Sequence, residues 1–172
     1  MGIKKTKWFY LAPLAGKWLK IFPKIVDFAK KNKIKVMANP GHSQLKISTK
    51  KLYPLLKKID ILLLNLEEAK FLIRNFSLKS DKLIKEIRKI YPGILIITNG
   101  KERVFLVKDN KIFSALPRKV KIVDKTGAGD AFGAGFLAEF IKTDGNLRKS
   151  LKFAILNSTS CLKKWGAKEG IL

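Results

Sequence analysis

The chain has 172 residues, 47% of them hydrophobic, so it can bury the core of one ordinary domain. Basic residues outnumber acidic ones by 37 to 13, which gives a formal net charge of +24. No segment approaches the roughly 20 apolar residues of a membrane helix, so no membrane partner is predicted. Cys161 is the only cysteine and His42 the only histidine. This excludes a disulfide framework, cysteine-based metal sites and most catalytic triads, and fits a cytoplasmic location.

The positive charge is spread along the whole chain. Only five of the 37 basic residues are arginine, and no basic block is longer than two or three residues. Sequence-specific nucleic-acid sites favour arginine forks and interleaved aromatic side chains. We therefore interpret the charge as a solvated, lysine-rich surface rather than a nucleic-acid partner. A basic nucleic-acid-binding protein remains an alternative function.

Short apolar runs typical of strands alternate with longer segments of helical periodicity. In chain order, the pattern predicts strands at 7–11, 35–39, 61–65, 94–98, 103–108, 111–115 and 120–123. It predicts helices at 18–32, 49–58, 67–75, 80–91, 127–142 and 147–164. The strands at 103–108 and 111–115 form a hairpin. Continuous apolar strands between helices predict an α/β fold of three α/β/α layers with a mostly parallel sheet.

Polar residues follow three of the predicted strands. One strand ends at Asn65, directly before Glu67 and Glu68, and a second ends at Thr98. The predicted strand 120–123 leads into a glycine-rich turn. Ligands of open α/β sheets bind beyond the carboxyl ends of the strands. We therefore expect the three segments to converge at one edge of one sheet.

The glycine-rich turn is the sharpest chemical signal. Gly127 and Gly129 allow a tight turn and a close approach of the backbone to a ligand. The helix that follows presents free N–H groups and its positive dipole end, a combination suited to an anion. Asp130, in the first helical turn, can accept a proton from an attacking hydroxyl. The alternative is an ordinary glycine turn in which Asp130 caps the start of the helix or complements the helix dipole.

Residues 124–132, with the sequence DKTGAGDAF, resemble the D-T-x-G-A-G-D-x-F signature of the ribokinase-like (PfkB) family of carbohydrate kinases. The resemblance implies a ribokinase-like fold and transfer of the γ-phosphoryl group of ATP to a hydroxyl of a sugar, nucleoside or related alcohol. It implies that Asp130 is the catalytic base. It also implies that Gly127, Ala128 and Gly129 form the anion hole.

The resemblance extends to the cofactors. Asn65 and Glu68 match the N-x-x-E motif, which organises Mg²⁺ and phosphate through water. Without the signature, the favoured interpretation of this pattern would be first-turn acids on a helix. The nucleotide-binding positions carried over are Thr98, Gly100 and Thr126. Asp124, together with Thr126, matches positions that hold a monovalent cation such as K⁺ in some members.

Several positions depart from the family pattern or refine it. Arg103 stands where many members have a second glycine after the T-x-G turn, and Lys125 replaces the usual threonine of the signature. Asn39 and the proline after it resemble the N-P of ribokinases. The segment 165–167 resembles the final G-A beside the adenine pocket. Ile155 occupies the place of an asparagine found in some ribokinases.

The resemblance spans nearly the whole chain but only somewhat more than half of a usual member, its carboxyl-terminal part. We therefore interpret residues 1–172 as a single kinase domain that lacks the amino-terminal part with the lid and the sugar site. The alternatives are a non-catalytic nucleotide-binding relic and one half of a split kinase. A separate amino-terminal half or a homodimer are the protein partners expected, and the isolated chain can be inactive.

Two side chains with reactive groups, Cys161 and His42, lie outside these motifs. Cys161 lies in the last predicted helix and is interpreted as a small core residue rather than a nucleophile. His42 lies in a predicted loop with no neighbour in sequence to relay a proton.

Overall fold

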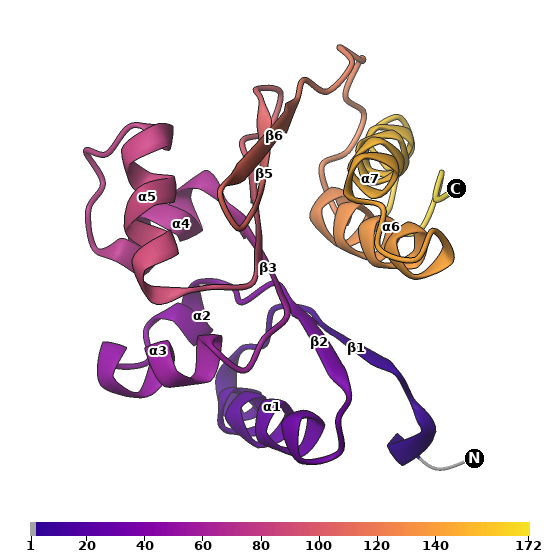
Figure 1. Ribbon diagram of the computed structural model, residues 1–172. Helices are drawn as coiled ribbons and strands as arrows, with labels where there is room; N and C mark the ends of the chain where they lie inside the picture. Colours follow the sequence, from indigo (N-terminus) through magenta and orange to yellow (C-terminus); the bar gives the residue numbers. More distant parts are fainter. Residues whose placement is uncertain (1–2) are drawn as a thin grey trace. The chain divides into compact units, whose positions relative to one another are not determined.

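The computed structural model describes residues 3–172, and these group into two compact units. The first unit comprises the chain up to Thr98 together with Leu106–Ile112. The second comprises Asn99–Phe105 and Phe113–Leu172. Figure 1 labels the helices and strands of both units.

Six strands form one sheet in the order β1-β2-β3-β4-β5-β6. Their bounds are β1 Trp8–Leu11, β2 Lys35–Ala38, β3 Ile61–Asn65, β4 Ile94–Thr98, β5 Val104–Lys108 and β6 Lys111–Ala115. The pairs β1/β2, β2/β3 and β3/β4 are parallel. The fold class is therefore α/β with a mostly parallel sheet, as predicted.

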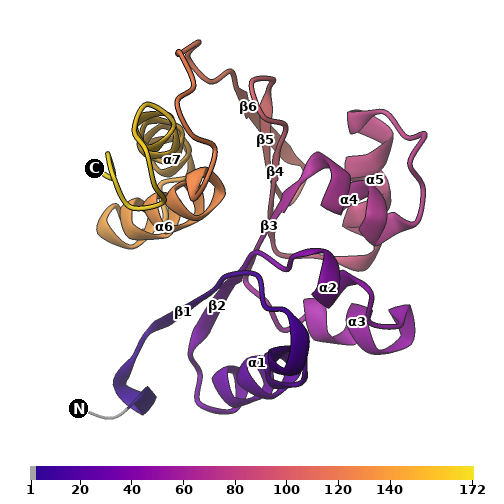
Figure 2. The same ribbon diagram turned by 180° about the vertical axis from the view of Figure 1, so that it is seen from behind.

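Helices connect the parallel strands of the first unit (Figure 2). They are α1 Ile21–Lys31, α2 His42–Leu45, α3 Thr49–Leu56, α4 Leu66–Ile73 and α5 Ser80–Ile90, with 3₁₀ turns η1 Ile3–Lys5 and η2 Gly16–Lys20. In β3 and β4 every residue except the last is buried. The helix α4 packs against β3 and α5. Burial of the strands on both faces explains their continuous apolar runs.

Tyr91 closes one end of this core. Its side chain is fully buried and its hydroxyl donates to the carbonyl of Ile94 at 3.2 Å. Burial raises the pKa of the Tyr91 phenol well above its ordinary value. A Cβ at Gly93 would lie 2.3 Å from the tyrosine hydroxyl oxygen, so only glycine fits beside the ring.

The second unit is built on a pair of long helices, α6 Ala128–Lys142 and α7 Leu147–Cys161, which pack along each other. A Cβ at Gly135 would approach the side-chain nitrogen of Asn157 to 2.9 Å, so glycine lets the two helices come close. The amide of Asn157 is buried. It donates to the carbonyl of Ala131 at 2.7 Å and accepts from the N–H of Leu172 at 2.7 Å.

Two predicted elements differ from the structure. The predicted strand 120–123 is wrong: this segment forms no strand, Ile122 and Val123 are exposed, and the N–H of Val123 donates to the carbonyl of Leu162 instead. The helix predicted from Trp18 begins at Ile21, because the residues before it form the 3₁₀ turn η2. The remaining predicted helices and strands are present, with ends shifted by at most three residues.

None of the helices that the structure describes is both long and apolar enough to cross a bilayer.

Candidate functional site

The carboxyl ends of four parallel strands lie at one edge of the sheet in the first unit. The register pairs Asn65 with Thr98, the last residues of β3 and β4, and Leu11 with Ala38, the last residues of β1 and β2. The predicted meeting of Asn65 and Thr98 at one edge is therefore confirmed. Such an edge is where ligands of open α/β sheets bind.

Asn65 and Glu68 form a reciprocal capping box at the start of α4. The amide oxygen of Asn65 accepts from the N–H of Glu68 at 2.8 Å, and Oε2 of Glu68 accepts from the N–H of Asn65 at 2.8 Å. This arrangement satisfies two N–H groups that the helix start would leave without acceptors. The N-x-x-E spacing therefore has a local structural role, whatever it binds.

Asn39, directly after β2, joins this cluster. Its amide donates to the carbonyl of Leu63 at 3.0 Å and lies 3.5 Å from Oε2 of Glu68, the limit of a hydrogen bond. The sequence pointed to Asn39 only as a family resemblance, and its contact with Glu68 was missed. The signal was its position: it follows a parallel strand next to β3, so it had to lie at the same edge.

Glu68 is mostly buried, and this burial raises the pKa of its carboxyl above the ordinary value of 4.5. The N–H of Asn65, the amide of Asn39 and the charge of His42 act in the opposite direction. His42, for which the sequence showed no neighbour to relay a proton, lies within electrostatic reach of Glu68. Its ring also packs against Phe71, with centroids 4.2 Å apart.

The cluster suits a hydrated magnesium ion. Oε1 of Glu68 has no hydrogen-bond partner among residues 3–172, so it is available to accept from a metal-bound water. Oxygen acceptors held at a strand end match the preference of Mg²⁺, which keeps several of its waters. In the described part of the chain, no three His, Cys, Asp or Glu side chains gather to ligate a metal directly.

In the second unit, Gly127 forms the turn before α6 and is required by two constraints. Its φ of +78° lies in the left-handed region that disfavours other residues. A Cβ there would also lie 2.6 Å from the carbonyl oxygen of Ala167. The predicted tight turn is present, and its glycine fits against the carboxyl-terminal segment.

Gly129 is a glycine that the surrounding protein does not require. Its φ is not positive, and a Cβ there would meet no atom within 4 Å. Within the described residues, the N–H groups of Gly129 and Asp130 have no acceptor, whereas the N–H of Ala128 donates to the carbonyl of Lys125 at 3.3 Å. The helix start therefore offers two free donors beside open space, which is an arrangement suited to an anion.

Asp130 lies in the first turn of α6 and is exposed to solvent. No ion pair or hydrogen bond of its carboxylate occurs among residues 3–172. It does not cap the helix start through its side chain, so the capping alternative is not supported. The carboxylate is free to accept a proton from a bound hydroxyl.

Asp124 holds the turn together. Its Oδ1 accepts from the N–H and the hydroxyl of Thr126 at 2.9 and 2.8 Å, and its Oδ2 accepts from the N–H of Gly166 at 3.1 Å. These bonds, those from Thr126 first, lower the pKa of the Asp124 carboxyl. The carboxylate thus ties the turn to the carboxyl-terminal segment.

Cys161 supports the same turn. Its thiol is buried, and Sγ lies 3.7 Å from the carbonyl oxygen of Thr126 and 3.9 Å from that of Ala167. This position agrees with its interpretation as a core residue. Ile155 is also buried, and the asparagine of this helix is Asn157, two residues further on. The hydrogen bond by which Asn157 connects α7 to α6 was not predicted from the sequence.

Gly100 lies in a turn with φ of +53°, where the N–H of Glu102 donates to the carbonyl of Asn99 at 2.8 Å. A Cβ at Gly100 would meet no protein atom within 4 Å. Arg103, just before β5, donates to the hydroxyl of Ser114 on β6 at 3.1 Å. The glycine that many family members have here is replaced by a residue that stabilises the hairpin.

The structure thus brings together Asn65, Glu68 and Thr98 in the first unit. In the second unit it gathers Asp124, Thr126, Gly127 and Asp130. Convergence of the two groups on one ligand stays a prediction.

A parallel sheet with polar residues at its carboxyl edge, and a glycine turn that opens a helix, define an α/β protein of the ribokinase-like fold. The chain belongs to the pfkB family of carbohydrate kinases, whose family description matches residues 4–171. It is 32% identical over 148 residues to a ribokinase of Lactococcus lactis, and 30% identical over 151 residues to a cytidine kinase of Thermococcus kodakarensis.

Solved structures share the fold. A chain described as a "putative Ribokinase II in complex with ATP and Mg+2 from E.coli" matches 99% of this chain with a TM-score of 0.82 at 19% identity. Adenosine kinase from Schistosoma mansoni, in complex with 2-fluoroadenosine, matches 97% with a TM-score of 0.78 at 25% identity.

The chain spans about half the length of these proteins. The matches cover 86% and 83% of this chain, but 45% of the ribokinase and 51% of the cytidine kinase. In the two solved structures they cover 56% and 53%.

Proposed function

We propose that the protein is an ATP- and Mg²⁺-dependent phosphotransferase, which moves the γ-phosphoryl group of ATP to a hydroxyl of a sugar or nucleoside. The observation that carries this proposal is the start of α6. There, two free N–H groups, a glycine facing open space and an exposed carboxylate occur within four residues. The ATP, sugar and nucleoside chemistry of the relatives supports it.

In this proposal, each element of the helix start has one task. The turn Gly127–Gly129 and the N–H of Asp130 hold the charge of the transferring phosphoryl group, because free donors at a helix start favour an anion. Asp130 accepts the proton of the attacking hydroxyl as the new O–P bond forms and the bond to ADP breaks. Thr98, Gly100 and Thr126 contact the nucleotide.

Asn65 and Glu68 hold Mg²⁺ through water, with Asn39 fixing the orientation of the Glu68 carboxylate. When bound, magnesium neutralises charge on the phosphates. Asp124 and Thr126 as a K⁺ site stay a prediction from the family resemblance. Every hydrogen bond described for Asp124 supports its role in holding the turn.

The substitution Asp130→Asn tests the assignment of the base. In a form of the protein that shows sugar- or nucleoside-dependent ADP release, the variant should lower turnover by about 10²–10⁴-fold, the usual contribution of a general base. The affinity for Mg·ATP should stay within about threefold, because the removed carboxylate donates nothing to the phosphates. Calorimetric titration and a coupled ADP assay give the two quantities.

Asp144→Asn is the matched control. Asp144 follows the opposite end of α6, is exposed, and has a positive φ that asparagine also tolerates. This variant removes the same charge without touching the turn, so turnover should be unchanged. An Asp130→Asn variant with the turnover of the unmodified protein would contradict the assignment.

A further inference from the structure

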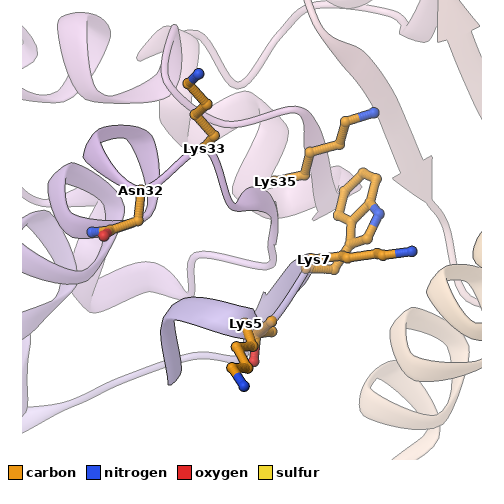
Figure 3. Close-up of a pocket in the computed structure, with 7 residues that line it drawn as sticks. Lys5, Lys7, Asn32, Lys33 and Lys35 are labelled. Carbon is orange, nitrogen blue, oxygen red and sulfur yellow. The ribbon is translucent and has the colours of Figure 1, made fainter. Parts of the chain in front are cut away.

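A second basic site lies in the first unit, at the edge strand β1. It is an open cleft of about 430 Å³ lined by Lys5, Thr6, Lys7, Trp8, Asn32, Lys33 and Lys35 (Figure 3). The cleft joins two segments, the entry into β1 and the turn between α1 and β2. The N–H of Lys35 donates to the carbonyl of Lys7 at 3.0 Å, which fixes these segments side by side.

The four lysines of the cleft are not neutralised. Among the described residues, none of them has a carboxylate within ion-pair distance. The acids of neighbouring elements are engaged elsewhere. Asp27 of α1 pairs with Lys58 at 2.6 Å, and Asp60 before β3 accepts from the N–H of Val36 at 2.8 Å. The cleft therefore presents four exposed positive charges with no local counterion.

Lys33 occupies a position where glycine is the usual choice. Its φ is +58°, directly after the C-cap Asn32 of α1, and this left-handed conformation disfavours side chains with a Cβ. The chain accepts backbone strain here and gains a lysine at the rim of the cleft.

The cleft is separate from the candidate kinase site. Lys7 precedes β1 and Lys35 begins β2, so both lie at the amino ends of their strands. Asn65 and Thr98 lie at the carboxyl ends of β3 and β4, at the opposite edge of the same parallel sheet. A ligand in the cleft would therefore leave the carboxyl edge open.

We propose that the cleft binds the phosphate backbone of a single-stranded nucleic acid, a binding site in addition to the proposed kinase activity. The ammonium groups do not converge on one point: in Figure 3 the side chains of Lys5 and Lys33 extend in opposite directions. A single small phosphate can reach only part of this set. A chain of phosphates can engage all four lysines in succession.

The charges also favour a polymer on energetic grounds. Exposed lysine–phosphate pairs are individually weak and screened by salt, so only a ligand that makes several at once is retained. The lysine ammonium is a compact point charge that contacts a phosphate without the fixed fork geometry of arginine. Such contacts suit a backbone site that does not depend on the base sequence. A bilayer surface is flat and fits a hollow less well than a flexible strand does.

The test measures binding of a fluorescein-labelled oligouridylate to the protein by anisotropy, between about 50 and 250 mM KCl. The cleft variant carries Lys5→Gln, Lys7→Gln, Lys33→Gln and Lys35→Gln. The control variant carries Lys50→Gln, Lys51→Gln, Lys82→Gln and Lys85→Gln, four exposed lysines outside the cleft. Both lose the same charge. Any purification tag belongs at the carboxyl terminus, away from Lys5.

The cleft variant should bind at least about tenfold more weakly at 100 mM KCl, and the control variant less than about threefold. The slope of log affinity against log salt should fall by about 3 in the cleft variant, since each phosphate contact on a single strand contributes about 0.7. Equal losses in the two variants would overturn the proposal, as would the absence of binding by the unmodified protein.

Two further arms separate the sources of phosphate. Tripolyphosphate should compete only weakly with the oligonucleotide. If it competed equally well at the same phosphate concentration, the ligand would be a small anion and the proposal of a polymer would be wrong. Vesicles of phosphatidylcholine and phosphatidylserine should bind the cleft and control variants equally. If only the cleft variant lost vesicle binding while both bound the oligonucleotide alike, the site would be a lipid site and the proposal wrong.

Lys33→Gly gives a test that does not depend on net charge alone. Glycine relieves the positive φ, so the melting temperature should rise. Oligonucleotide affinity should nevertheless fall, by more than for the single change Lys50→Gln. A lower melting temperature, or unchanged affinity, would contradict the role given to Lys33.

Discussion

Glu68 combines a structural and a chemical task in one side chain. One carboxylate oxygen completes the capping box with Asn65, while the other has no partner in the described residues. Keeping a charged carboxylate in a mostly buried position opposes folding, which is why burial raises its pKa. An arrangement that costs stability and leaves an acceptor open is typical of a binding site.

The raised pKa of Glu68 gives a pH-dependent stability with a definite sign. A carboxyl with a raised pKa binds its proton more tightly in the folded state. Its stabilising contribution is complete below the ordinary value of 4.5 and is lost as the pH rises through the raised pKa. Glu68→Gln should therefore gain stability relative to the unmodified protein as the pH rises from about 4 to 7.

The gain should come from removal of the buried charge alone, because glutamine can still accept from the N–H of Asn65. Urea unfolding at several pH values measures it, and Mg²⁺-dependent nucleotide binding should weaken in the same variant. Glu67→Gln, at an exposed neighbour, should show neither effect. The relevant quantity is the stability of Glu68→Gln minus that of the unmodified chain. If this difference fell between pH 4 and pH 7, the burial argument would be refuted.

At the scale of elements, the start of α6 contains two glycines that are required for different reasons. Gly127 is fixed by its positive φ and by the carbonyl of Ala167. Gly129 has an ordinary φ and no protein atom near its absent Cβ. Internal packing requires the first, and only a ligand would require the second.

The two alanine substitutions should therefore have opposite effects on stability. Gly127→Ala should destabilise by about 2–4 kcal/mol, combining a left-handed alanine with an overpacked contact. Gly129→Ala should stabilise by about 0.5–1 kcal/mol, since alanine is the better helix former, yet weaken Mg·ATP binding by filling the open space. Thermal unfolding and calorimetric titration report both. Normal Mg·ATP binding by Gly129→Ala would show that the anion hole does not lie at this position.

Local patterns predicted most of these elements, and the failures have a common cause. Both ends of the strands Ile61–Asn65 and Ile94–Thr98 were predicted, because continuous apolar runs end abruptly at polar residues. The prediction of a strand at 120–123 was wrong. The apolar pattern is typical of a strand, but the N–H of Val123 donates to the carbonyl of Leu162 and not to a neighbouring strand. Which partner a short segment meets is decided by the tertiary structure.

The same reason applies to the site. The glycine turn and the N-x-x-E spacing are local and were visible in sequence. The contact of Asn39 with Glu68 spans 29 residues, and the bond from Asn157 to Ala131 spans 26. No periodicity encodes such distances. Only the order of parallel strands, once known, brings Asn39 to the edge that also carries Asn65.

At the scale of the whole molecule, the fold divides the proposed chemistry between two units. The proposed magnesium-binding residues lie in the first unit, and the proposed base with its anion hole lies in the second. The match covers about half the length of the relatives, 45% of the ribokinase and 51% of the cytidine kinase. None of the residues of the proposed site is assigned to hold the acceptor.

This division leads to a prediction for the 172 residues produced as a separate polypeptide. Phosphoryl transfer is mostly positioning, and alignment of hydroxyl, phosphate and base can supply about 7–11 kcal/mol of the barrier reduction. The chain carries the proposed base, anion hole and magnesium-binding residues, so it should bind Mg·ATP. If none of its residues orients an acceptor, ADP release in the presence of sugars or nucleosides should not exceed the slow hydrolysis by water.

The measurement is calorimetric binding of Mg·ATP, followed by a coupled ADP assay against a panel of sugars and nucleosides. Asp130→Asn should leave the binding intact and suppress the residual hydrolysis, which shows that the hydrolysis arises at this site. Robust sugar-dependent turnover by the 172 residues would mean that the acceptor site lies within them. Loss of Mg·ATP binding in the unmodified polypeptide would instead mean that the two units do not form a nucleotide site on their own, because the proposed magnesium-binding residues and anion hole belong to different units.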